Sequence, residues 1–235
     1  MTDIQTTPTS QAIDAAVDAR AMLAHPFYRA WTDGQLTLGD LRAYAGQYFH
    51  HVEAFPRAVS AVHAACPDRL GRRMLAENLA EEEGVGEGRQ DHASLWMMFA
   101  QGMGADRPEV ESTVLNLETR ALIDAFRRLS TRSYAAGLGA LYAYESQFAG
   151  VARAKIEGLV ERYGVTDEPT LRFFRVHEHA DVAHSAVCRD LLDRLHGVDR
   201  ADAVNAGQEL AAALWGFLSG VERQVALKER VAHAC

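Results

Sequence analysis

The chain has 235 residues, 48% of them hydrophobic, and a formal net charge of −8, which together allow one domain with a sizeable core. The acidic balance and the lack of a clustered Lys/Arg face argue against nucleic acid as a partner, and no stretch reaches the roughly 18 apolar residues that span a membrane. With no signal-peptide pattern and three cysteines that have neither disulfide nor metal-ligand spacing, the sequence predicts a soluble, cytoplasmic protein whose partners are small molecules or proteins.

Helical periodicity runs through most of the chain, and proline, glycine and capping residues divide it into segments. Few β-branched runs and no Asn-Gly hairpin signal leave little support for strands. The expected helices span about residues 10–31, 37–66, 67–83, 90–102, 109–130, 132–163, 170–195 and 201–231. The sequence therefore predicts an all-α bundle of seven to eight antiparallel helices, a single domain over residues 10–235 that follows a flexible segment at 1–9.

Particular residues set the boundaries of these helices. Pro26 should interrupt the first helix, and Pro56 should kink the second. Thr37 and Asp40 form an acidic variant of the capping box at the start of the second helix. The Gly-rich stretch at 84–91 follows a helix and lacks the G-x-G-x-x-G spacing, so it predicts a loop and not a phosphate site.

The most informative pattern lies in the segment 170–195. His177, Asp181 and His184 stand at i, i+4 and i+7, so at about 100° per residue they share one helix face with apolar side chains. Burial of a carboxylate costs several kcal/mol unless the group is paired or binds a metal, and imidazoles supply nitrogen ligands. A metal site explains three ionisable groups at core positions. The alternative is a surface helix with incidental histidines.

Two further apolar stripes carry an acidic residue. Glu145 lies within a seam of Leu and Phe residues, and Glu82 shares a face with Leu75 and Leu79. His92 begins the helix that follows the loop. An acidic triplet is ordinarily a solvated helix end, and a histidine at a helix start is ordinarily a surface residue. The full set nevertheless suits two iron ions, or iron with manganese, better than a structural zinc site. Its members are Glu82, His92, Glu145, His177, Asp181 and His184.

Several motifs occur in an order that resembles a known family. They extend from about residue 25 to about residue 217 and comprise HPFYRAW, LRAYAGQYFHHVEAFPRAVSAVH, ENLAEEEG with HASLWMMFAQGMG, LYAYESQ, VARAKIEGL and FFRVHEHADVAHS. The chain resembles the heme-oxygenase-like iron-containing redox enzymes, in the branch of the chlamydial protein associating with death domains, near pyrroloquinoline-quinone synthase. The resemblance implies a heme-oxygenase-like bundle. In this chain the loop before His92 is longer than is typical of the family, so Glu81, Glu82 and Glu83 are alternatives for one metal ligand.

The same resemblance implies synthesis of para-aminobenzoate for folate from a tyrosine of the enzyme itself, with dioxygen as co-substrate and an external reductant. Carried over by motif, the consumed residue is Tyr28 and the amino donor is Lys155, while Tyr44 and Tyr144 would pass an electron or proton. From the residues alone, the tyrosines are core aromatics and Lys155 keeps its ammonium in water. Family members commonly pair, and an apolar face around 211–218 also suggests a homodimer.

Other activities on this fold are alternatives at this stage. A dimetal oxygenase or oxidase could act on an external small molecule with Tyr28 as a bystander. A cofactorless oxidase like pyrroloquinoline-quinone synthase is disfavoured by the carboxylates Glu145 and Asp181. A thiamin-degrading hydrolase is disfavoured because no cysteine lies between residues 132 and 163. An interaction protein that binds death domains belongs to a different class, and nothing in the sequence marks such a surface.

Overall fold

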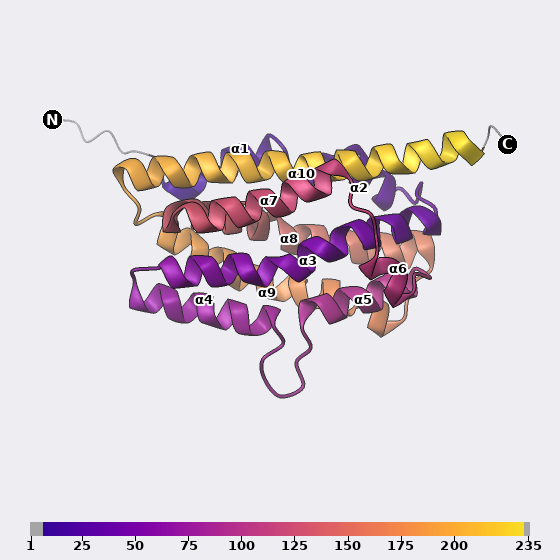
Figure 1. Cartoon of the computed structure of the whole chain (residues 1–235), viewed down its shortest axis with the longest axis horizontal. Coiled ribbons are helices and arrows are strands. Elements are labelled where there is room, and N and C mark those ends of the chain that lie inside the picture. The colour runs from indigo at the N-terminus through magenta and orange to yellow at the C-terminus, as the bar shows by residue number, and fades with distance from the viewer. Residues whose placement is uncertain (1–6, 233–235) are drawn as a thin grey trace.

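The computed structural model describes residues 7–232, which form ten α-helices, one 3-10 turn and no strand (Figure 1). The long helices run along the longest axis of the molecule, with α10 along one side and α4 and α5 end to end along the other. The elements are α1 (Thr9–Asp18), the 3-10 turn η1 (Met22–Ala24), α2 (Pro26–Thr32), α3 (Leu38–Ala65), α4 (Arg69–Glu82), α5 (His92–Gly102), α6 (Arg107–Glu111), α7 (Leu117–Arg132), α8 (Tyr134–Tyr163), α9 (Glu168–Leu192) and α10 (Gly197–Ala232). The predicted all-α class is confirmed.

Two of the expected helices are each divided. The first ends at Asp18, and η1 separates it from α2, whose N-cap His25 accepts a hydrogen bond from the Phe27 backbone N–H at 3.1 Å. The second case is the helix expected over 109–130, which is α6 followed by α7. The side chain of Asn116 caps α7 by accepting a hydrogen bond from the Thr119 N–H at 2.7 Å. Asparagine is favoured at such a capping position and disfavoured inside a helix. The prediction of one helix there is wrong for this reason.

The start of α3 follows the sequence closely. The Thr37 backbone N–H donates to Asp40 Oδ2 at 2.8 Å, and the Asp40 N–H donates to Thr37 Oγ1 at 3.2 Å, which completes the predicted capping box. Pro56 lies inside α3 without ending it. Most of the expected flexible segment, residues 1–6, lies outside the described residues, whereas Thr9 already belongs to α1 and is buried.

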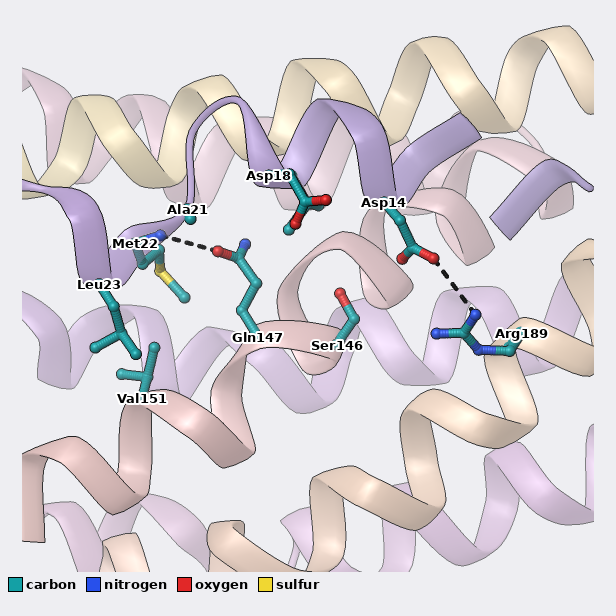
Figure 2. A pocket seen from close by; sticks show the side chains of 10 residues that line it. Asp14, Asp18, Ala21, Met22, Leu23, Ser146, Gln147, Val151 and Arg189 are labelled. Atoms are coloured by element: carbon teal, nitrogen blue, oxygen red, sulfur yellow. Dashed lines mark hydrogen bonds and ion pairs between the residues drawn. The ribbon is translucent and has the colours of Figure 1, made fainter. Parts of the chain in front are cut away.

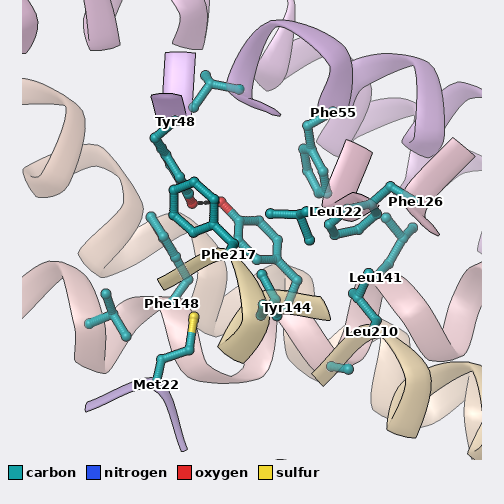
Figure 3. Packing of buried hydrophobic residues seen from close by; sticks show 14 of the residues in the cluster. Met22, Tyr48, Phe55, Leu122, Phe126, Leu141, Tyr144, Phe148, Leu210 and Phe217 are labelled. Carbon is teal, nitrogen blue, oxygen red and sulfur yellow. Dashed lines mark hydrogen bonds between the residues drawn. The ribbon is translucent and has the colours of Figure 1, made fainter. Parts of the chain in front are cut away.

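The core lies around α8, which packs against α7, α9 and α10. Aromatic rings from α3, α7, α8 and α10 fill one part of it, and they include Tyr48, Phe55, Phe126, Tyr144, Phe148 and Phe217 (Figure 3). The apolar face at 211–218 of α10 also belongs to this core, because Leu214, Phe217 and Leu218 are at most 1% exposed. The expectation that this face is spare surface is wrong, so it gives no support to a homodimer, which stays a prediction. None of the described helices is long and apolar enough for a membrane span.

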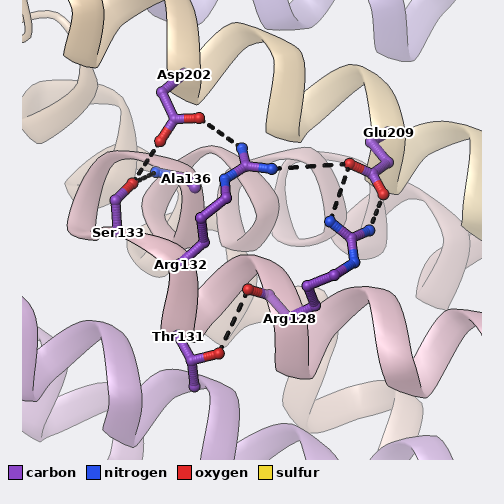
Figure 4. A network of polar contacts seen from close by, with 7 residues as sticks. All are labelled: Arg128, Thr131, Arg132, Ser133, Ala136, Asp202 and Glu209. Carbon is purple, nitrogen blue, oxygen red and sulfur yellow. Dashed lines mark hydrogen bonds and ion pairs between the residues drawn. The ribbon is translucent and has the colours of Figure 1, made fainter.

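Charged side chains join α7 to α10 at the surface (Figure 4). Arg132 donates to Asp202 at 2.6 Å, and Arg128 pairs with Glu209. Asp202 also accepts a hydrogen bond from the Ser133 hydroxyl at 2.5 Å, which places this contact at the start of α8. Exposed ion pairs contribute little stability each, so the contact of α7 and α8 with α10 depends mainly on the apolar core.

The close approach of α8 and α10 generates a stability prediction. A Cβ added at Gly139 would lie 2.2 Å from the Ala203 carbonyl oxygen, whereas one at Gly150 of the same helix would meet no atom within 4 Å. We expect Gly139→Ala to lower the free energy of unfolding by about 1–3 kcal/mol, because the α10 backbone must move. Gly150→Ala should raise it by about 0.5–1 kcal/mol through helix propensity. Urea unfolding measures both; equal effects would contradict the close approach.

Candidate metal centre

Six buried or nearly buried side chains from α4, α5, α8 and α9 form two neighbouring triads. Within each triad the donor atoms all lie within 4.8 Å of one another. One triad consists of Glu82, His92 and His177, and the other of Glu145, Asp181 and His184. The structure thus brings together all six residues that the sequence patterns selected.

The loop between α4 and α5 places Glu82 next to His92. Glu82 is the last residue of α4 and His92 the first residue of α5, whose N-cap Asp91 accepts from the Ser94 N–H at 2.7 Å. Gly84 has a φ of 66°, and a Cβ there would lie 2.3 Å from the Asp91 nitrogen. Only glycine lets the chain turn back so closely. As a result, His92 Nδ1 lies 2.7 Å from Glu82 Oε2.

Three carboxylates crowd the centre. Burial raises the pKa of Asp181 well above its usual range, and the nearby carboxylates of Glu145, Glu82 and Glu81 raise it further. Burial also raises the pKa of Glu145, although His184 and the hydrogen bond from Asn78 Nδ2 at 2.8 Å oppose that rise. Without compensating cations, the negative forms of these groups destabilise one another.

Two buried polar atoms of the triads have no hydrogen-bond partner in the part of the chain that the structure describes. Among the described residues, neither Asp181 Oδ2 nor His92 Nδ1 has a hydrogen-bond partner, so the short contact of His92 with Glu82 is not a hydrogen bond. His177 Nδ1 lies 2.7 Å from the Phe173 carbonyl oxygen. When the ring donates its Nδ1 proton to this carbonyl, Nε2 keeps a free lone pair that can bind a metal, which is the usual arrangement of a metal-binding histidine. Burial keeps this imidazole neutral by lowering its pKa well below the ordinary value. The donor set therefore fits metal ions.

The acidic triplet at the end of α4 divides into three different environments. Glu82 belongs to a triad and is buried, whereas Glu83 is exposed. Glu81 is one-third exposed and its Oε2 lies 3.0 Å from His184 Nε2, next to the second triad. Asn78, which supports Glu145, was not singled out from the sequence. Its place one turn before Glu82 on the same face of α4 is the signal that could have identified it.

A second buried polar cluster surrounds Lys155. Lys155 is 2% exposed, and its amine hydrogen-bonds with the Tyr44 hydroxyl and lies 4.8 Å from the centre of the Tyr28 ring. The Tyr28 and Tyr44 hydroxyl oxygens are 3.1 Å apart. Aromatic rings enclose the amine on its other sides, among them Trp31, Trp96, Phe148 and Phe174. The interpretation that Lys155 keeps its head in water is wrong, and burial lowers its pKa well below the usual value.

Aromatic contacts connect this cluster to the triads. Tyr44 stacks on Tyr48 with ring centres 5.5 Å apart, and the Tyr48 and Tyr144 hydroxyl oxygens are 2.7 Å apart (Figure 3). Tyr48 also stacks on Phe148, whose ring centre is 5.1 Å from that of His177. Sequence reasoning missed Tyr48, although its i+4 spacing from Tyr44 puts both rings on one face of α3.

Two large cavities open near the bundle. One, of about 430 Å³, lies between α1, η1, α8 and α9, where Gln147 bonds the Met22 backbone and Arg189 pairs with Asp14 (Figure 2). None of the six triad residues lines it. The other, of about 420 Å³, lies between the 84–91 loop and α9, and it reaches His92. Of these two cavities, the second is the one lined by a triad residue.

The chain is similar to proteins of a known family. The family model described as iron-containing redox enzyme matches residues 42–216. The chain belongs to this family. It is 38% identical over 207 residues to a 4-aminobenzoate synthase of Chlamydia muridarum, covering 88% of this chain and 86% of the relative. It is 37% identical over 223 residues to a 4-aminobenzoate synthase of Nitrosomonas europaea, covering 90% and 89%.

A solved structure extends the comparison to the fold. A domain of unknown function with a heme oxygenase-like fold, from Shewanella denitrificans, matches with a TM-score of 0.75 at 18% identity, covering 94% of this chain and 91% of that one. The predicted heme-oxygenase-like fold is therefore confirmed. Membership of the family makes the chain a redox enzyme, as its motifs predicted.

The metal centre predicts the behaviour of an Asp181→Asn variant. Because Asp181 offers an unpartnered buried oxygen, we expect the variant to lose transition-metal affinity by more than the roughly 10–100-fold that loss of a supporting hydrogen bond costs. Metal analysis after loading with iron and manganese, followed by dialysis, measures this. Glu178→Gln, on the outer face of α9, is the matched control and should load like the wild type. Full loading of Asp181→Asn would contradict the assignment.

The buried amine predicts an unusual pH dependence of stability. Burial lowers the pKa of Lys155 in the folded chain, so between that lowered pKa and the ordinary one the folded chain binds fewer protons than the unfolded chain. Stability should therefore rise from pH 7 to pH 9, by up to about 1.4 kcal/mol per pH unit. Lys155→Met should remove this rise and be more stable at pH 7. Arg153→Met, an exposed change on the same helix, should keep it. Urea unfolding at pH 7 and pH 9 measures the change in stability for each protein. If stability rose with pH as steeply in Lys155→Met as in the wild type, the buried amine would not be its cause.

Proposed function

We propose that this chain is a dioxygen-activating dimetal oxygenase that makes para-aminobenzoate from its own Tyr28, with Lys155 as the amino donor. The observation that carries the proposal is the position of the Lys155 amine, buried without an ion pair among the described residues and 4.8 Å from the Tyr28 ring centre. The identity of 37–38% to relatives named 4-aminobenzoate synthase, over about nine-tenths of the chain, supports the same activity.

The two triads would hold the metals. Glu82, His92 and His177 would bind one ion, and Glu145, Asp181 and His184 the other. Mixed carboxylate and imidazole donors suit two iron ions, or manganese with iron, and the unpartnered Asp181 oxygen and His92 nitrogen fit such ligands. When bound, the ions supply activation of dioxygen, with electrons from an external reductant.

Lys155 has the properties of a nucleophile. An amine attacks only when it is unprotonated, and burial in the aromatic cluster favours that form near neutral pH by lowering the pKa. The hydrogen bond with the Tyr44 hydroxyl holds Nζ against the Tyr28 ring. The protein thus keeps the amine both neutral and oriented.

Tyr28 has the properties of the consumed residue. Burial raises the pKa of Tyr28, so its phenol stays protonated, and oxidation must remove a proton together with an electron. The Tyr44 oxygen, 3.1 Å from the Tyr28 oxygen, is positioned to take part in that proton movement. Tyr48 and Tyr144 continue the path toward the triads through a second hydroxyl pair.

The atoms of the product are accounted for within the cluster. The ring and Cβ of Tyr28 have the carbon skeleton of para-aminobenzoate, with the two substituents already para to one another. The Cα–Cβ bond breaks and dioxygen oxidises Cβ to the carboxylate. The phenol oxygen leaves as water when the Lys155 nitrogen bonds to the ring carbon, and the Lys155 Cε–Nζ bond must then break to release the amino group, with dioxygen and the external reductant balancing the electrons. Because Tyr28 is destroyed, the protein would be a reactant that acts once.

A second candidate is a dimetal oxygenase with an external substrate, for which Tyr28 is a bystander. The cavity of about 420 Å³ that reaches His92 has room for a small molecule and favours this alternative. A cofactorless oxidase is disfavoured, because three carboxylates buried together have no role without cations.

The Tyr28→Phe variant separates these two functions. With metals, reductant and dioxygen but no added substrate, the wild type should release para-aminobenzoate in no more than stoichiometric amount, and labelled tyrosine in the protein should label the product. Tyr28→Phe should release none but bind metals normally, because its phenol is not a ligand. Tyr142→Phe, whose hydroxyl bonds Asp14, is the control and should react normally. Mass spectrometry of protein and product measures both. Product from Tyr28→Phe at the wild-type level would exclude the sacrificial role.

A further inference from the structure

The cavity over His92 has a cationic rim. It is bounded by the 84–91 loop, which projects from the bundle between α4 and α5 (Figure 1), and by one face of α9. Arg89 comes from the loop, and Arg172 and His179 come from α9. His92 and Glu81 line the same cavity, so a molecule bound there would meet the edge of the first triad.

The charges at this rim are unbalanced. Arg172 forms no ion pair with a described residue, and the closest atoms of Arg89 and Glu81 are 3.7 Å apart. Glu81 also contacts His184, so the carboxylate of Glu81 is divided between Arg89 and His184. Two guanidinium groups therefore face one partly engaged carboxylate, on a chain whose net charge is −8. Such a cleft concentrates small anions against the overall repulsion of the protein.

The rest of the wall suits the body of an organic molecule. Leu95 and Val176 contribute apolar surface, while the guanidinium groups offer planar sets of donors for carboxylate, phosphate or enolate oxygens. The volume of about 420 Å³ falls in the range of small-molecule sites. An inorganic ion would leave the apolar wall unused.

We propose that this cavity binds a small organic anion that is the external reductant of the enzyme. The anion gives up two electrons, one for each ion of the metal centre, releases any protons to solvent, and leaves in oxidised form without a bond to the protein. Arg89 and Arg172 are binding residues for its negative group, and His92 is the part of the centre nearest to it. The inference rests on the proposed function only in assuming that the centre needs reduction.

Binding to the metal-free protein tests the site apart from catalysis. We expect ascorbate, used as the probe anion, to bind about tenfold more weakly to Arg89→Gln/Arg172→Gln than to the wild type, the effect of losing a charge-assisted contact. Arg175→Gln, one turn along α9 and paired with Glu168, is the control and should bind normally. Isothermal titration calorimetry at low and high salt gives the affinities. Equal affinity for all three proteins would overturn the proposal.

Reduction of the metal-loaded protein supplies the second readout. Loss of the two arginines should slow reduction of the metals by ascorbate, followed by absorbance, but leave reduction by neutral dithiothreitol unchanged. If 4-aminobenzoate binds through these arginines and ascorbate does not, the cavity is a product site and the reductant assignment fails. Ascorbate binding that depends on the arginines, without any para-aminobenzoate formed, would sink the proposed function but support this site.

Discussion

The mutual repulsion of three buried carboxylates is the constraint on which the rest of this structure depends. Glu82, Glu145 and Asp181 come from three different helices and face one small volume, where burial and the neighbouring charges oppose ionisation of Asp181. Such an arrangement is stable only with protons or cations between the groups, and three imidazoles around the same volume select metal ions over protons. The turn at Gly84, the bond from Asn78 and the Phe173 carbonyl all hold donor atoms toward that volume.

Helix α8 carries both Glu145 and Lys155, and it keeps the Lys155 amine away from the buried carboxylates. Glu145 and Lys155 are separated along α8 by about 15 Å at the usual rise per residue, and aromatic rings occupy the space between them. A carboxylate beside Lys155 would hold it as an ammonium ion and remove its nucleophilic lone pair. The apolar enclosure therefore lowers the pKa of Lys155 and separates the amine from the buried carboxylates of the metal centre, which would raise it.

Different parts of the site were predictable from the sequence to different degrees. His177, Asp181 and His184 depend only on the helical period of α9, so the residues identify them directly. Pairing Glu82 with His92 depends on a loop whose tight turn a glycine pattern suggests but does not specify. The burial of Lys155 could not be read from α8 alone, because the enclosing rings come from α2, α3, α5 and α9. The separation of α6 from α7 was missed because a single capping residue decides it.

Burial of the tyrosines determines how charge could move between the two clusters. The pKa values of Tyr44, Tyr48 and Tyr144 are all raised well above the ordinary range, first by desolvation, so none of these phenols ionises before it is oxidised. An electron therefore leaves each ring only with its proton. Each hydroxyl has another within 3.1 Å, as Tyr28 has with Tyr44 and Tyr48 has with Tyr144, so that proton has a short path. For the oxidation of tyrosine that we propose, the paired hydroxyls would supply the proton acceptor that an isolated buried phenol lacks.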